Sequence, residues 1–184
     1  LKHKDGDWVD VLSRATAVFD ENGTAVRIVG THVDISERKQ AEEALRKSES
    51  TLQKVFDILP IGLWFADETG QLLRGNPAGK RIWGAEPKVG MEEYGVFKAR
   101  RYPSGEELKP NDWALAATIL EGATIVDEML EIDAFDGIKR VILNYTAPLK
   151  GGDGSIKGAV VVNNDITDLI STQESLNKAK VDAE

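Results

Sequence analysis

The sequence of 184 residues has no cysteine, only two histidines, and no apolar run near the roughly 20 residues that a membrane-spanning helix needs. Without cysteine the segment has no disulfide, no thiolate metal site and no cysteine nucleophile. Both His3 and His32 lie in a strand-like part, so the predicted helices carry no phosphoacceptor histidine. The missing thiols fit a reducing compartment. We therefore expect a cytoplasmic segment without membrane contact.

Positive charge is also scarce, since 31 acidic residues outweigh 23 basic ones and give a net charge of -8. This balance disfavours nucleic acid as a partner, because phosphate binding needs a clustered basic face. The one basic cluster, from Lys98 to Arg101, stands in a loop-like stretch, and we interpret it as solvated surface.

The sequence also lacks a catalytic pattern. The acidic residues are scattered, and no pair of them indicates an acid/base couple. The run Gly151-Gly152-Asp153-Gly154 is typical of a hairpin turn, and no glycine-rich run stands between a strand and a helix as a phosphate cradle would. We predict no catalytic residue and no metal ligand in this segment, and hence no enzymatic activity of its own.

What the sequence does contain is a repeat. The stretch from Ala159 to Asp168 is an apolar run that ends in Asp165-Ile166-Thr167, and an earlier stretch ends in Asp34-Ile35-Ser36. The two aspartates are 131 positions apart, and the same offset pairs Asp5-Gly6 with Asp136-Gly137. The chain therefore carries a repeated module whose first copy lacks its front half, and it reads as an excerpt of a longer polypeptide.

The first copy predicts two strands, over 7–19 and 24–35, joined by a turn that contains Gly23. An isolated hairpin is marginal in water, so we expect it to complete a sheet whose other strands lie upstream. Ser36 is a suitable helix cap, and the helix is expected to run over 37–59 until Pro60 stops it.

Leucines recur every seven residues along this helix, at Leu45, Leu52 and Leu59. This spacing is that of a coiled-coil seam, and it favours a parallel two-helix coiled coil over a plain amphipathic linker. Both interpretations stay open at this stage.

The complete module follows. Asn76 with Pro77 indicates a capped short helix that ends at Trp83, and Gly122 is expected to end a helix that starts at Pro110. Between them, 84–110 is expected to be mostly irregular. Strands are predicted over 62–66, 71–74, 124–135, 138–149 and 156–166.

This order of elements resembles a PAS domain with its C-terminal PAC motif, of the kind found in bacterial and archaeal sensor histidine kinases. The resemblance rests on Asp165-Ile-Thr167, Asp34-Ile-Ser36, Asn76-Pro77-Ala78 and the stretch from Asp112 to Gly122. It implies an α+β fold with a five-stranded antiparallel sheet in the order 2-1-5-4-3, short helices on one face, and long amphipathic signalling helices on both sides. The expected parts are a truncated PAS tail (1–36), a connecting helix (37–59), a complete PAS/PAC domain (60–167) and the start of an output coiled-coil helix (168–184).

In this family the aspartate of the exit motif commonly pairs with a basic residue just inside the following helix. The resemblance thus implies a pair between Asp34 and Arg38, whereas the equivalent of Arg38 in the second copy is Leu169, which continues the heptad seam instead. The residues expected to form the signal junctions are Asp34, Ser36, Arg38, Asp165, Thr167 and Leu169.

The resemblance also implies a small-molecule pocket, for which the large rings and one polar anchor are candidates: Trp64, Trp83, Tyr94, Trp113 and Asn144. A core filled only by these side chains is the alternative. Cysteinyl-flavin chemistry and histidine-ligated haem are disfavoured, because the complete module has neither residue. A noncovalent flavin, a small metabolite or no ligand at all remain open.

We therefore expect a sensory and dimerisation module of a sensor histidine kinase. It would form a homodimer through helices 37–59 and 168–184 and relay its input to an output kinase domain in the same polypeptide. The alternatives are a ligand-free dimerisation scaffold, or the input module of a cyclase-type or other output protein.

Overall fold

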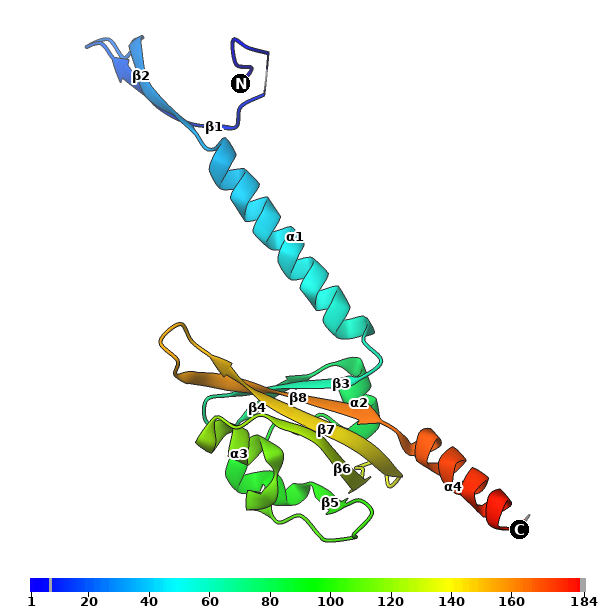
Figure 1. Cartoon of the computed structure of the whole chain (residues 1–184). Helices are drawn as coiled ribbons and strands as arrows, with labels where there is room; N and C mark the ends of the chain where they lie inside the picture. The colour runs from blue at the N-terminus through cyan, green and yellow to red at the C-terminus, as the bar shows by residue number, and fades with distance from the viewer. Residues whose placement is uncertain (7, 183–184) are drawn as a thin grey trace. The chain divides into compact units, whose positions relative to one another are not determined.

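The computed structural model describes residues 1–6 and 8–182. The chain divides into two compact units, residues 1–54 and 55–184 (Figure 1). The predicted output segment 168–184 ends in residues 183 and 184, which lie outside the described residues.

The first unit contains an antiparallel hairpin of β1 (Val11–Phe19) and β2 (Ala25–Asp34). The turn forms as predicted, because the Asp20 carboxylate accepts the amides of Asn22 and Thr24 while Gly23 takes a φ of 79°. Every residue of β2 is exposed. No further strand of the described residues pairs with this hairpin. Most of β1 is also exposed, so the hairpin has neither a neighbouring strand nor a well-covered face.

Helix α1 (Ser36–Ile58) follows, one residue earlier at each end than predicted. It ends just before Pro60, as the missing proline amide requires. Leu45 and Leu52 on the predicted seam are 61% and 67% exposed. These two leucines are therefore uncovered within the described residues, whereas the third, Leu59, lies just beyond α1 and is half-buried. The coiled coil remains a prediction.

The second unit is built on a six-stranded antiparallel sheet in the order β4-β3-β8-β7-β6-β5 (Figure 1). Numbered within the module, five of these strands have the predicted order 2-1-5-4-3, and a sixth strand extends the sheet beyond them. The strands are β3 (Gly62–Asp67), β4 (Leu72–Gly75), β5 (Lys98–Arg101), β6 (Ile125–Asp133), β7 (Lys139–Lys150) and β8 (Ile156–Asp165). The five predicted strands thus form where expected.

Short helices cover one face of this sheet and enclose the core. They are α2 (Pro77–Trp83), the 3-10 helices η1 (Met91–Val96) and η2 (Pro110–Asp112), and α3 (Ala114–Glu121). The inner sheet face contributes fully buried side chains such as Leu130, Ile132 and Ile142. After β8 the chain leaves the sheet in α4 (Thr167–Val181).

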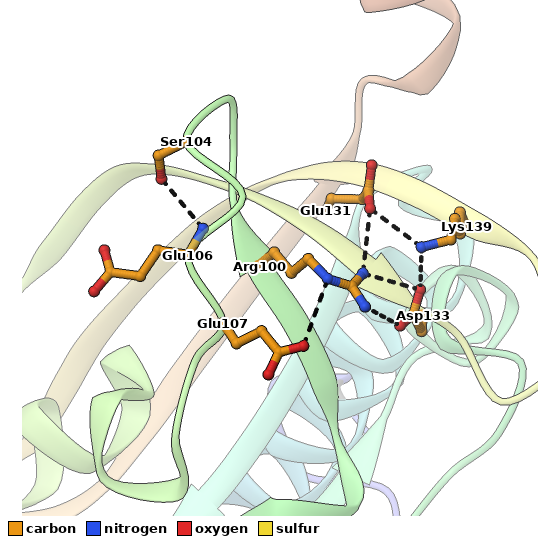
Figure 2. Close-up of polar contacts among 7 residues, drawn as sticks. All are labelled: Arg100, Ser104, Glu106, Glu107, Glu131, Asp133 and Lys139. Atoms are coloured by element: carbon orange, nitrogen blue, oxygen red, sulfur yellow. Dashed lines mark hydrogen bonds and ion pairs between the residues drawn. The ribbon is translucent and has the colours of Figure 1, made fainter.

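The interpretation of Lys98 to Arg101 as a loop was wrong. These residues form the edge strand β5, which buries Ala99 inward and places Arg100 opposite Glu131 on β6. Arg100 lies 3.3 Å from the Glu131 carboxylate and 3.2 Å from that of Asp133, and Lys139 bonds to the same two carboxylates (Figure 2). Cross-strand pairing of opposite charges stabilises a strand whose sequence alone carries no β pattern.

The helix expected from Pro110 is also interrupted. Pro110 to Asp112 form a single 3-10 turn, Trp113 is extended with a ψ of 130°, and α3 begins only at Ala114. The extended backbone turns the indole of Trp113 into the core, where it is 9% exposed. The predicted end at Gly122, with a φ of 69°, is confirmed.

The side chain of Asn76 joins three elements of the second unit. It is fully buried, and its Oδ1 accepts the amides of Gly79 in α2 (2.8 Å) and Leu63 in β3 (2.9 Å). Its Nδ2 donates to the carbonyls of Phe56 in α1 (3.1 Å) and Ile61 (2.9 Å). The predicted role of Asn76 as a helix cap is confirmed, and the same amide also fixes where α1 ends and β3 begins.

We predict that Asn76→Ala lowers the free energy of unfolding of the second unit by about 3 kcal/mol, because several buried backbone groups lose their partners at about 1–3 kcal/mol each. Urea unfolding followed by tryptophan fluorescence measures this change. Asn111→Ala, at an exposed position in the same unit, is the control and is expected to cost less than about 0.5 kcal/mol. Equal stability of the two variants would contradict the role of Asn76.

Candidate functional site

A cavity lies between the inner face of the sheet and the short helices. It offers about 60 Å³ to the centres of water molecules, which is room for roughly four to six waters. All five predicted pocket residues line it: Trp64, Trp83, Tyr94, Trp113 and Asn144. The structure thus brings together residues that are up to 80 positions apart, while their binding of a ligand remains a prediction.

Several lining residues were not predicted, among them Phe97, Thr146 and Asn163. Phe97 stands in the stretch expected to be irregular, where no periodicity indicates an inward position. Asn163 and Thr146 occupy alternate, inward positions of β8 and β7, and a polar residue at an inward position was the available signal.

Aromatic rings form much of the wall. The ring of Trp83 lies 5.1 Å from that of Phe97 in an edge contact and 6.1 Å from that of Trp113, and Phe97 and Trp113 are 5.8 Å apart. Such tilted and edge contacts are favourable for aromatic pairs. The three rings therefore stabilise one another and give the cavity a rigid apolar wall.

The polar groups of the wall are mostly engaged. The Tyr94 hydroxyl donates to the Gly70 carbonyl, and burial, together with the nearby negative charge of Asp67, raises the pKa of Tyr94 well above its usual value. The hydroxyls of Thr118 and Thr146 bond to each other at 2.6 Å. By contrast, the buried indole Nε1 atoms of Trp64 and Trp113 have no acceptor within the described parts of the chain.

A row of side-chain hydrogen bonds crosses the inner sheet face from the cavity toward β5. Trp83 Nε1 donates to Asn163 Oδ1 (2.9 Å), and Asn163 Nδ2 donates to Asn144 Oδ1 (2.9 Å). Asn144 Nδ2 donates to Glu128 Oε2 (2.8 Å), whose other oxygen accepts Arg101 Nη1 (2.9 Å). Asn144 therefore connects the cavity wall to an ion pair at the sheet edge.

The residue after Arg101 extends this connection to α4. The hydroxyl of Tyr102 donates to the Glu174 carboxylate at 2.9 Å, and this bond raises the pKa of Tyr102. Since the Tyr102 amide also donates to the Met129 carbonyl of β6, the ring is held between the sheet edge and α4.

The junction after β8 is built from Asp165 and Thr167. The Asp165 carboxylate accepts the amide of Thr167 at 3.0 Å and its hydroxyl at 2.5 Å, while that hydroxyl oxygen accepts the amide of Val141 on β7 at 2.9 Å. The amide of Ile166 donates to the Val141 carbonyl. The first turn of α4 is therefore bonded to β7 as well as to its own strand.

The first copy has the same bonds at the equivalent positions. The Asp34 carboxylate accepts the amide of Ser36 at 2.9 Å, which lowers the pKa of Asp34. The Ser36 hydroxyl accepts the amide of Asp10 at 3.0 Å, and the Ile35 amide donates to the Asp10 carbonyl. Asp10 is 131 positions before Val141, so the sequence repeat corresponds to a repeated junction geometry.

The expected pair of Asp34 with Arg38 is not formed. Arg38 bonds to Glu42, one turn further along α1, at 2.8 Å, because residues four apart share a helix face. In the second copy, Asp165 does have an arginine nearby, since Arg140 on β7 approaches it at 3.8 Å. Arg140 is held mainly by Asp136 at 2.8 Å, which lowers the pKa of Asp136 to about 2. Leu169 is 65% exposed.

No group of three or more metal-ligating side chains gathers within the described residues. In the same part of the chain, none of the helices is both long and apolar enough to span a membrane.

No model of a protein family matches the chain. The chain is 34% identical over 79 residues to the sensor protein FixL of Bradyrhizobium diazoefficiens, and this match covers 43% of the chain but 15% of that protein. It is 33% identical over 70 residues to the uncharacterized protein y4lL of Sinorhizobium fredii, covering 38% of the chain and 8% of that protein. The chain thus spans a small part of the relatives that it matches.

Solved structures are similar at the level of the fold. An RNA-binding light-oxygen-voltage receptor covers 96% of the chain with a TM-score of 0.55 and 14% identity, and the match takes in 45% of that structure. The PAS domain of BvgS from Bordetella pertussis covers 74% of the chain with a TM-score of 0.49 and 20% identity, and the match takes in 98% of that domain. At 14% identity, the first of these likenesses concerns the fold alone.

We predict that Thr167→Val lowers the free energy of unfolding by about 1–2 kcal/mol, because the buried amide of Val141 loses its acceptor. Hydrogen exchange should speed up at Val141 and in the first turn of α4. Thr172→Val is the matched control, since its hydroxyl donates to the Asp168 carbonyl inside α4. Unchanged amide hydrogen exchange at Val141 in the Thr167 variant would contradict the proposed contribution of the Thr167–Val141 hydrogen bond.

Proposed function

The second unit has the PAS fold, and we propose that it is the sensory module of a larger signalling protein, one that detects a small molecule in the cavity and relays its presence to α4. The observation that carries this proposal is the cavity with its row of hydrogen bonds leading to the sheet edge. Because this row of hydrogen-bonded side chains (the polar row) starts at the cavity wall, a bound molecule would change its hydrogen bonds. Asn144 is the anchor of this row.

Two routes lead from the cavity to the output helix. Along β8, Asn163 at the wall is two residues from Asp165 at the junction. Across the sheet, the row reaches Arg101, and the next residue bonds to Glu174 in α4. A ligand acts through these routes only if it binds two arrangements of the module with different affinity.

The first unit is proposed to be the tail of a preceding PAS domain. Its support is the repeated junction, in which Ser36 has the bonds that Thr167 has in the second copy. The uncovered faces of the β1–β2 hairpin fit a segment whose neighbouring strands belong to residues upstream.

We further propose a homodimer through the helices 37–59 and 168–184. Leu45 and Leu52 on α1, and Leu169 and Leu176 on α4, are all at least half exposed. Exposed leucines at seven-residue spacing favour pairing with the same seam of a second copy. Leu169 would then contribute to helix pairing, which fits an apolar residue at the position that Arg38 has in the first copy.

For the parent protein we propose a cytoplasmic sensor histidine kinase with its kinase domain in the same polypeptide. The support is the similarity to a sensor protein over 43% of the chain.

The size of the cavity also limits which cofactor it can hold. The cavity has room for roughly four to six waters, and we propose a small metabolite rather than a flavin as its occupant.

The signalling route is tested in the parent protein by inserting one residue after Asp168. One residue rotates the rest of the helix by about 100°, so we expect a changed output activity together with an unchanged unfolding temperature of the sensory module. Seven inserted residues restore the phase of a heptad seam and are expected to restore regulation. An output that ignores the single insertion would refute the relay.

The rival function is a ligand-free dimerisation scaffold. Native mass spectrometry of the purified chain separates the two functions, because it reports the number of copies and any retained small molecule together. A retained or readily bound compound supports sensing. A dimer that retains no small molecule, and whose unfolding temperature no added small molecule raises, would favour the scaffold.

A further inference from the structure

The wall of the cavity between the sheet and the short helices exposes almost only apolar surface. Rings and branched aliphatic side chains, such as Phe97, Ile142 and Val161, form most of it. Within the described residues, no carboxylate, amine, guanidinium or imidazole lines the cavity. Because burying an unpaired charge costs far more free energy than burying a neutral polar group, this wall excludes charged molecules.

The polar side chains of the wall are engaged by other groups of the protein. The hydroxyls of Tyr94 and Thr146 each have a hydrogen-bond partner. The oxygen of Asn144 accepts from Asn163, the oxygen of Asn163 accepts from an indole, and both side-chain amides donate. A polar ligand would have to compete with these bonds, whereas an apolar ligand leaves them in place.

The two indole N–H groups without an acceptor do not make the wall more polar. The Nε1 atoms of Trp64 and Trp113 are both closed to solvent. Trp64 Nε1 lies against the backbone of α2, since a Cβ atom at Gly79 would be 2.8 Å from it. These two rings therefore present carbon atoms to the cavity.

We propose that the cavity binds a small, uncharged, apolar molecule of about four to six non-hydrogen atoms and selects it by shape and burial alone. The size follows from the room for roughly four to six waters. The driving force is the apolar surface that ligand and wall remove from water together. This ligand class rests on the proposed sensory function.

An apolar occupant acts on the polar row through the ring of Trp83. This ring is part of the wall, and its Nε1 donates to Asn163 at 2.9 Å in the first bond of the row. The same ring packs against Phe97 and Trp113. A molecule that spreads these rings moves the donor relative to Asn163, so the ligand needs no hydrogen bond of its own to be sensed.

Three five-membered rings of nearly the same shape test the ligand class on the full chain at pH 7: cyclopentane, tetrahydrofuran and the cation pyrrolidinium. Their affinities are measured from the indole N–H signals in NMR spectra and checked by the shift in unfolding temperature. We expect cyclopentane to bind at least about tenfold more tightly than tetrahydrofuran, because the ether oxygen loses its hydrogen bond to water in the cavity. Pyrrolidinium is expected not to bind. The indole signals of the three cavity tryptophans should move, whereas that of Trp8, which is 81% exposed, should not.

Two variants that fill the cavity from opposite sides test the location of the site. Val161→Phe introduces a phenyl ring from β8, and Leu115→Phe introduces one from α3. Either variant, once circular dichroism and cooperative unfolding show that it is folded, should lower the affinity for cyclopentane at least about tenfold. The matched control is Val126→Phe at a 55% exposed position of β6, which should leave this affinity unchanged.

The possible results separate the ligand class from the sensory function. Equal or tighter binding of tetrahydrofuran, or preferred binding of pyrrolidinium, would overturn the apolar class and leave a sensory pocket in place. Cyclopentane binding that moves no cavity indole signal, or that a folded filling variant retains in full, would also overturn the inference. If none of the three rings binds, the pocket of the proposed function fails together with the ligand class.

Discussion

The amide of Asn76 is the constraint on which the second unit depends. Four backbone groups from α1, the chain before β3, β3 itself and α2 meet at one fully buried side chain. Because Asn76 is fully buried, a residue without this amide would leave these groups without their partner. The arrangement fixes α2 against β3 and so positions Trp83, whose ring is the first member of the polar row. The helix cap Asn76 thus determines where Trp83 lies in the cavity wall.

The inner sheet face combines two demands that usually conflict. A core is most stable when it is apolar, yet Asn163, Asn144 and Glu128 occupy inward positions on three neighbouring strands. They are tolerated because each donates to or accepts from the next, and Arg101 closes the row at the edge. A fully paired row of this kind is rigid when complete and costly when broken. A molecule that binds in the cavity and breaks one of these hydrogen bonds would therefore disturb the whole row.

The sequence was sufficient for five strands, the turns and the exit motif of the second unit, because hydrophobic alternation and turn residues act locally. The strand order and the pocket positions of the five residues were expected only from the resemblance to PAS domains. The sequence was insufficient for β5 (Lys98–Arg101), which pairs with β6 and whose Arg100 bonds to carboxylates more than 30 positions away. The same reason explains Arg140 beside Asp165, whereas Arg38 pairs with Glu42 on its own helix face. Charged side chains choose partners in space, whereas spacing along the chain identifies only those on the same helix face.

The bond between Thr167 and Val141 has a mechanical consequence. The start of α4 is fastened to two adjacent strands rather than continuing freely from one. A helix held at such a point can swing or turn about it, but it cannot slide along β8 without breaking bonds to β7. The movement available to α4 is therefore a rotation about its bonded first turn. Because the helix is long, a small rotation near the sheet produces a larger displacement at the far end of the helix.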